Sequence, residues 1–172
     1  MDDARFMEEA LRLARRAAEA GEVPVGAVIV HEGRVIARAH NQVETLRDAT
    51  AHAEMIAITQ AAEALDNWRL SGAEIYVTLE PCPMCAGAMV LSRVARIVYG
   101  ADDPIAGACG STFNIVAEKK LNHRIPVVKG VLGDRCGELL RGFFKSRRAA
   151  SDVRRPPMGN PTPPAPPAGN ED

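Results

Sequence analysis

Short runs of β-forming residues alternate with helical segments along most of the sequence, and this alternation constrains the fold more than any other feature. Residues 73–79, AEIYVTL, have the density of β-formers typical of a buried strand, and residues 81–94 follow with prolines and small residues that open a helix. Strands over 95–101 and 125–133 and a helix over 134–148 continue the pattern. Strands that alternate with helices predict a layered α/β domain.

The first third of the sequence predicts an amphipathic helix and a β-hairpin. Residues 23–41 are rich in Val and Ile and form two predicted strands around a tight turn at 31–34. Thr50 is placed to cap a further helix over 51–64, and the predicted element order is α-β-β-α-β-α-β-α-β-α. The first helix ends at Gly21, and its apolar stripe consists of Phe6, Ala10, Leu13, Ala14 and Ala17.

Length and composition fit one domain followed by a tail. The chain has 172 residues, of which 47% are hydrophobic, and this is enough to bury one core. From Arg155 onward the sequence holds 7 of the 12 prolines and almost nothing to bury. We therefore predict a domain over residues 1–150 and a disordered Pro-rich tail over 151–172.

The cysteine content and the absence of long apolar runs indicate the compartment. No apolar run approaches the roughly 20 residues of a membrane span, and the first residues are acidic and amphipathic rather than signal-like. We expect a cytoplasmic protein that does not enter a membrane. Four cysteines in such a protein favour a metal or redox role over disulfides. Cys109 and Cys136 are most simply buried small apolar residues.

Charge is distributed unevenly along the chain. Residues 1–118 carry 10 basic and 17 acidic side chains, whereas residues 119–155 carry 11 basic and 3 acidic ones. The second block therefore has a net charge of 11 − 3 = +8. A basic block of this density fits either a polyanionic partner or a solvated helix face.

The pair Cys82 and Cys85 is the first candidate for chemistry. Such a Cys-x-x-Cys pair is a redox couple, half of a four-ligand structural zinc site, or two of the three ligands of a catalytic zinc. The other cysteines have no second ligand at zinc-binding spacing, so the structural site loses support. His52, at the start of another predicted helix, supplies a third ligand and leaves the fourth position for water.

Glu54 is the candidate catalytic base. Two thiolates and a neutral imidazole cancel the 2+ charge of zinc, so the metal needs a nearby base to activate its water. Glu54 is about 200° around a helix from His52 but only one short rise along it, so both can border one cavity. Taken singly, Glu54 also fits a solvated helix residue and His52 a satisfied core or surface histidine. Together with PCPMC they match the zinc-deaminase pattern H-x-E followed by P-C-x-x-C.

Beyond this signature, the sequence resembles the bacterial tRNA-specific adenosine deaminases of the cytidine deaminase superfamily. The likeness runs in unbroken register from about Phe6 to Arg148, and its stretches are VPVGAVIV, HNQ, AHAE, NWRL, TLEPCPMCAGAM, YGADD, GSTFN, LNHR and FFKSRR. It implies a three-layer α/β/α fold with a central mixed five-stranded sheet. It also implies a homodimer with one Zn²⁺ per subunit that acts on the tRNA anticodon stem-loop.

The resemblance further assigns roles to individual residues. His52, Cys82 and Cys85 would hold zinc, and Glu54 would shuttle protons while water attacks C6 of adenine at the wobble position, giving inosine. The tRNA substrate would be tRNA-Arg with anticodon ACG. The residues expected to contact substrate are Asn41, Ala53, Asp103, Arg124, Phe144 and Arg148.

Some of these positions have ordinary structural readings as well. An Asn after a strand often forms a turn, and so does the Asp-Pro pair at Asp103. Phe143 and Phe144 point about 100° apart on a helix, so one can face the core while the other meets RNA or a partner. Two other functions also stay open: a deaminase of free guanine or cytosine derivatives, and a non-catalytic RNA-binding protein that keeps zinc for folding.

Overall fold

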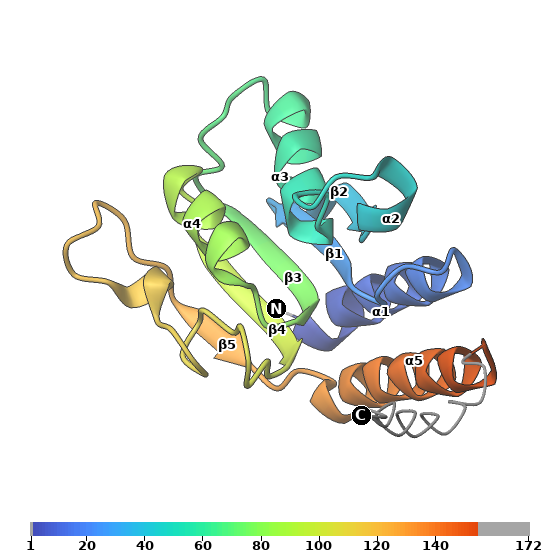
Figure 1. The fold of residues 1–172 in the computed structure, drawn as a ribbon. Helices are drawn as coiled ribbons and strands as arrows, with labels where there is room; N and C mark the ends of the chain where they lie inside the picture. The colour runs from blue at the N-terminus through green and yellow to red at the C-terminus, as the bar shows by residue number, and fades with distance from the viewer. Residues whose placement is uncertain (1, 155–172) are drawn as a thin grey trace, which may run out of the picture.

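A mixed five-stranded sheet forms the centre of the computed structural model, which describes residues 2–154 (Figure 1). In sheet order β2-β1-β3-β4-β5, β1 is antiparallel to both of its neighbours, while β3, β4 and β5 are parallel. The predicted mixed sheet is confirmed. The strands are β1 (Gly26–His31), β2 (Arg34–His40), β3 (Ala73–Leu79), β4 (Arg96–Ala101) and β5 (Val127–Lys129).

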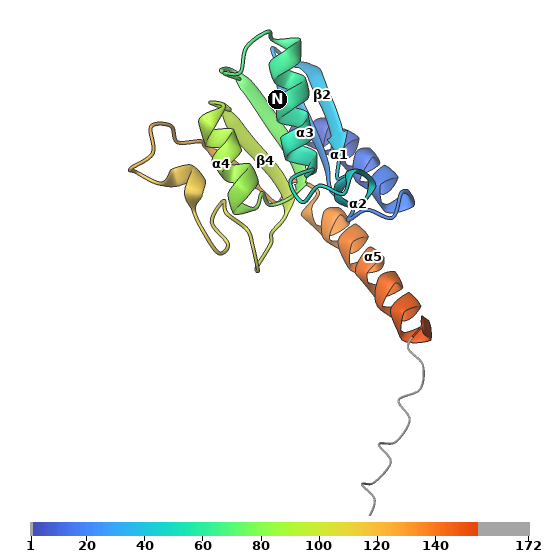
Figure 2. The ribbon, with the colours of Figure 1, turned by 45° about the horizontal axis from the view of Figure 1, so that its top comes forward.

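Helices cover both faces of this sheet. Helices α3 and α4 pack on one face, and α1 and α5 lie on the other, where α5 extends beyond the sheet (Figures 1 and 2). This arrangement confirms the predicted three-layer α/β/α fold. The helices are α1 (Asp3–Glu19), α2 (Val43–Leu46), α3 (Ala53–Ala64), α4 (Pro83–Leu91) and α5 (Gly133–Arg154).

The two apolar clusters follow from the alternation of side chains along the strands. In β3, Ile75 and Val77 belong to the cluster under α3 and α4, whereas Tyr76 between them belongs to the cluster under α1 and α5. All three side chains are fully buried. The central strand is therefore apolar on both faces, as expected for a strand between two helical layers.

The packing of α1 against β1 fixes the turn that joins them. A Cβ at Gly26 would overlap the main chain of α1 at Ala10, so only glycine allows this close approach. Gly21 has φ of +79° and ends the helix, as predicted. The N–H of Glu22 then donates to the carbonyl of Ala17 at 2.9 Å. This turn places Glu22 close to Gly26, the first residue of β1.

The predicted N-cap of α3, the helix that follows the loop after β2, is wrong. His52, not Thr50, occupies the N-cap of α3. Thr50 lies in a turn instead, where its hydroxyl donates to Asp48 at 2.7 Å. The hydroxyl that the prediction assigned to helix capping thus bonds to the side chain of Asp48, two residues earlier in the chain. The same loop also contains the short helix α2, which the sequence did not predict.

The segment between β4 and β5 also differs from the prediction. The predicted element order placed a helix there, but the segment contains only a 3-10 turn, Ile115–Ala117. Its main chain is bonded across the loop instead, for example from Ile115 to Ala108. The predicted strand over 125–133 is limited to β5, because the chain turns at Gly130 and Leu132, both with positive φ.

The C-terminal prediction is partly within the described residues. Helix α5 includes the predicted helix over 134–148 and extends through Arg154. Residues 155–172 of the predicted tail lie outside the described residues, and the domain boundary at residue 150 stays a prediction. Among residues 2–154, no helix is both long and apolar enough to span a bilayer.

Candidate active site

Two helix starts face each other at one end of the sheet. His52 is the N-cap of α3, and Cys82 is the N-cap of α4, with Cys85 in the first turn of the same helix. Pro83 at the first position of α4 fits there because its missing N–H has no partner in a helix start. Free N–H groups at both helix starts favour negative charge, and this environment stabilises thiolates.

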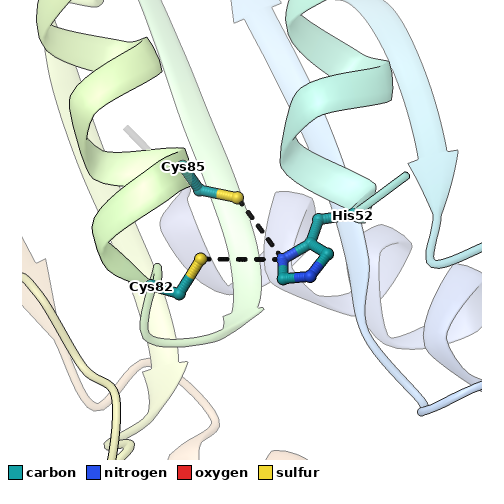
Figure 3. A group of neighbouring side chains, drawn as sticks. All are labelled: His52, Cys82 and Cys85. Atoms are coloured by element: carbon teal, nitrogen blue, oxygen red, sulfur yellow. Dashed lines mark hydrogen bonds between the residues drawn. The ribbon is translucent and has the colours of Figure 1, made fainter. Parts of the chain in front are cut away.

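The three side chains form a compact group whose geometry fits a metal ion (Figure 3). Nδ1 of His52 lies 3.7 Å from Sγ of Cys82 and 3.6 Å from Sγ of Cys85. Their ligand atoms all lie within 4.8 Å of one another. With Zn–N of about 2.0 Å and Zn–S of about 2.3 Å, two ligands of a tetrahedral zinc lie about 3.6 Å apart. The donor set and spacing therefore fit zinc with one open position.

The two thiols interact strongly with each other. A hydrogen bond from Cys85, together with one from His52, lowers the pKa of Cys82 to about 4. The same contact with Cys82, with burial, raises the pKa of Cys85. This contact favours a thiolate at Cys82. A bound divalent cation would remove the proton from a second coordinating thiol.

Glu54 lies beside this group and is only 4% exposed. Burial raises the pKa of its carboxyl to about 6, against the opposing effect of a main-chain hydrogen bond. A carboxyl that titrates near neutral pH can both accept and return a proton. Glu54 is therefore suited to general acid and base catalysis.

A cavity of about 340 Å³ opens onto the group, and its size suits one nucleobase or nucleoside. Both His52 and Glu54 line it, in agreement with the prediction that they border one cavity. A larger hollow of about 810 Å³ lies between β4 and α5, but His52, Cys82 and Cys85 do not line it. The remaining lining residues of the smaller cavity are Glu22, Val23, Val25, Asn41, Val43, Glu44, Leu79, Glu80, Cys82, Asp103 and Ala106.

Two of the predicted substrate residues lie in this cavity. Asn41 is 6% exposed and lines it. Asp103 also lines it, and one of its carboxylate oxygens accepts from the main-chain N–H groups of Ile105 and Ala106. Ala53 is fully buried in the core and does not line the cavity.

The other predicted substrate residues lie outside the cavity. Arg124 is exposed on the loop before β5, and Phe144 and Arg148 are exposed on α5. Of the two adjacent phenylalanines, Phe144 is 42% exposed and Phe143 is half-buried, with their rings in edge contact at 5.5 Å. Phe144 is thus the one available to a partner.

Two buried carboxylates of the cavity were missed in the sequence. Glu22 accepts hydrogen bonds around Asn41 and α2, and Glu80 accepts from the main-chain N–H groups of Asp103 and Cys109. Burial opposes the ionisation of each carboxyl, but these hydrogen bonds outweigh it and hold both pKa values below the ordinary range. A single Glu in a turn gives no sequence signal, whereas Glu80 directly precedes the PCPMC motif.

A family model and curated relatives match most of the chain. The model of the MafB19-like deaminases matches residues 1–148. The tRNA-specific adenosine deaminase of Bacillus subtilis is 52% identical over 153 residues, which cover 89% of this chain and 95% of that protein. The tRNA-specific adenosine deaminase of Aquifex aeolicus is 52% identical over 143 residues, which cover 83% of this chain and 94% of that protein.

Solved structures agree with this match. One solved structure comes from a study of A-to-I editing by tRNA:A34 deaminases at the wobble position of transfer RNA. It is 48% identical in sequence and superposes with a TM-score of 0.77, and the match covers 79% of this chain and 99% of that chain. The structure of guanine deaminase from Nitrosomonas europaea has a TM-score of 0.71 and 28% sequence identity. This match covers 81% of this chain and 83% of that chain.

Proposed function

Because the chain belongs to the MafB19-like deaminase family and its curated relatives are tRNA-specific adenosine deaminases, we propose that it converts adenosine to inosine at wobble position 34 of tRNA. One observation carries the proposal: the buried Glu54 lies beside His52, Cys82 and Cys85 in a cavity that suits one nucleoside. A hydrolytic deaminase needs a metal-binding group, a proton carrier and a site for one base.

The residues present fit one zinc ion per subunit, held by His52, Cys82 and Cys85. When bound, zinc supplies a polarised water for attack on C6 of the purine. Glu54 would accept a proton from the attacking water and deliver it to the ring nitrogen beside C6. It would then carry the second water proton to the amino group, which leaves as ammonia. Its raised pKa keeps both transfers feasible near neutral pH.

Substrate contacts divide between the cavity and the surface. Asn41 and Asp103 line the cavity and are proposed to bind the target nucleotide and its neighbour. Ala53, between His52 and Glu54 in the sequence, is also proposed to contact the substrate. Arg124, Phe144 and Arg148 are proposed to contact the anticodon stem-loop outside the cavity. The basic charge of residues 119–155 supports such a contact, because each neutralised phosphate adds affinity without reading sequence.

We further propose that the protein acts as a cytoplasmic homodimer. Large apolar side chains are exposed in the described chain, including Leu91 on α4 and Ile105 beside the cavity, at 73% and 85% exposure. A partner subunit would cover such side chains where they form a contiguous apolar patch. Light scattering on the purified protein should give twice the mass of one chain, and a monomer at micromolar concentration contradicts this part of the proposal.

A second candidate function is the deamination of a free base such as guanine. The likeness to guanine deaminase from Nitrosomonas europaea favours it, since a cavity of about 340 Å³ also suits a free base. The lower identity of 28%, against 52% for the tRNA-specific enzymes, ranks it second. A non-catalytic RNA-binding role ranks third, because it has no use for a buried Glu54.

The test is incubation of the purified protein with an unmodified tRNA-Arg transcript that carries anticodon ACG, followed by sequencing of position 34. We expect inosine with the parent and none with Glu54→Ala. Ammonia release from free guanine without RNA supports the second candidate. Tight tRNA binding without ammonia release from either substrate supports the third.

A further inference from the structure

Glu22 is a fully buried carboxylate with hydrogen bonds to three residues around the cavity. It lies in the turn before β1 and lines the cavity together with His52 and Glu54. One oxygen accepts from the main-chain N–H and the hydroxyl of Thr45, at 2.7 and 2.8 Å. The other accepts from the main-chain N–H of Glu44 at 3.2 Å and from Nδ2 of Asn41 at 3.3 Å.

The charge of Glu22 determines whether its neighbours must act as hydrogen-bond donors or acceptors. Burial alone would raise the pKa of Glu22, but the bonds from Thr45 and Glu44 and the nearby His40 lower it below its ordinary value. A carboxylate can only accept hydrogen bonds. Asn41 must therefore turn its NH₂ group toward Glu22, and the amide orientation follows from chemistry.

This orientation places the carbonyl oxygen of Asn41 on the cavity side. Among residues 2–154, Oδ1 of Asn41 accepts no hydrogen bond, and it is not a buried atom without a partner. It is therefore accessible from the cavity that Asn41 lines. A hydrogen-bond acceptor at this place meets a donor of the bound nucleoside, such as a ribose hydroxyl.

We infer that Glu22 is a positioning residue, which fixes the amide of Asn41 with its carbonyl oxygen toward the substrate and ties α2 to the same wall of the cavity. The inference rests on the proposed function for its substrate. The hydrogen bonds of Glu22 go to Asn41 and to Glu44 and Thr45 of α2. Its effect is on the orientation in which the nucleoside binds.

Glu22→Gln tests this with almost no change in shape. The Gln carbonyl satisfies both donors of Thr45, and its NH₂ then faces Asn41 and the main-chain N–H of Glu44. The bond from Glu44 is lost, and the amide of Asn41 turns and presents nitrogen to the cavity. We expect kcat/KM on the tRNA substrate to fall about tenfold, mainly through KM, because one oriented hydrogen bond is lost. Zinc content and Tm measure whether the variant is intact.

The reciprocal exchange separates positioning from general structural damage. Asn41→Asp alone places two carboxylates together and is expected to lose more activity than Glu22→Gln. In the double variant Glu22→Gln with Asn41→Asp, the Gln donates to the new carboxylate, whose second oxygen again faces the cavity. We expect kcat/KM of the double variant to recover to within about threefold of Glu22→Gln or better. If the loss of kcat/KM in the double variant equals the product of the two single losses, the inference is overturned.

Thr45→Val is the matched control. It removes the hydroxyl bond to Glu22 but leaves the bond to Asn41, so Tm falls while KM stays at the parent value. If Thr45→Val raises KM as much as Glu22→Gln does, the effect of Glu22 is merely structural and the inference fails.

A readout that needs no activity distinguishes this inference from the proposed function. In ¹⁵N-labelled parent protein, the side-chain amide proton of Asn41 that donates to the carboxylate should resonate downfield and exchange slowly. Glu22→Gln should remove both features. A parent that shows them but does not deaminate tRNA contradicts the proposed function alone, whereas an active parent without them contradicts the positioning role.

Discussion

His52 and Cys82 occupy the same structural position, the N-cap, in two neighbouring helices, and Nδ1 of the first lies 3.7 Å from Sγ of the second. Neither side chain caps its own helix with a hydrogen bond. Both instead point toward each other, together with Cys85 (Figure 3). Two helix starts that would each prefer a capping Ser or Asp thus carry candidate metal ligands. Residues that give no capping hydrogen bond reduce helix stability, and such local costs are expected at functional sites.

Replacement of Glu54 should separate catalysis from metal binding. Glu54→Gln keeps the shape but cannot carry the proton, so kcat should fall by about 10²-fold to 10⁴-fold. Zinc content and Tm should stay at or above the parent values, because the variant removes a buried carboxyl whose ionisation burial opposes. Inosine formation and metal analysis check this, and activity within tenfold of the parent contradicts the role.

Loss of a metal ligand should reduce stability as well as activity. Cys85→Ser should lose zinc and lower Tm, and a chelator should lower the Tm of the parent, because a ligand that binds only the folded state stabilises it. Cys109→Ser is the matched control, since Cys109 is outside the group and should leave one zinc per chain. Metal analysis and thermal unfolding give the answer, and equal zinc content in the two variants would disprove the ligand set.

Glu80 should stabilise the loop that carries Asp103. Its carboxylate accepts from the main-chain N–H groups of Asp103, Cys109 and Ser111, at 3.0, 3.0 and 3.1 Å. Glu80→Ala leaves these donors without a partner and should lower the free energy of unfolding by about 3 kcal/mol. Amide exchange at the three residues should speed up, and unchanged exchange there contradicts this account.

An ion-pair network at the start of α1 should make stability depend on pH. Hydrogen bonds from Arg96 lower the pKa of Asp3 below its ordinary 3.8, against burial, and Arg96 also pairs with Glu74. A lowered folded pKa gives stability that is present above about pH 4 and is lost as pH falls through the folded pKa.

Asp3→Asn should therefore lower the unfolding free energy by about 1 to 2 kcal/mol at pH 6, and by less as pH falls below 4. Denaturant unfolding across this range measures the difference. Glu63→Gln, at an exposed position on α3, is the control and should have little effect. A difference for Asp3→Asn that grows on acidification would reverse the expected sign.

The basic face of α5 should contribute to tRNA affinity without affecting chemistry. Lys145→Ala and Arg148→Ala should each weaken tRNA binding and reduce the slope of log K against log salt by about one unit. Both residues are exposed on α5. Arg34→Ala, at the first residue of β2 and paired with His31 at the end of β1, should leave the slope unchanged. Equal slopes in all variants would leave α5 without an RNA-binding role.

Local patterns in the sequence were enough for the secondary structure that depends on periodicity. The hairpin of β1 and β2, the buried strand β3 and the stripe of α1 were predicted because their side-chain spacing is a property of neighbouring residues. The predictions failed where a competing local contact won, as at Thr50, or where long-range bonds organise an irregular loop, as between β4 and β5.

The sequence by itself determined the chemistry: one histidine, two cysteines and a glutamate in the H-x-E and P-C-x-x-C spacings, each at a helix start. Only the tertiary structure decided which distant residues share the cavity. The sheet order places β3 between β1 and β4, and this brings Glu22 and Asn41 to the side of His52 and Glu54. Such contacts depend on strand pairing between segments far apart in the chain, and no pattern of adjacent residues encodes them.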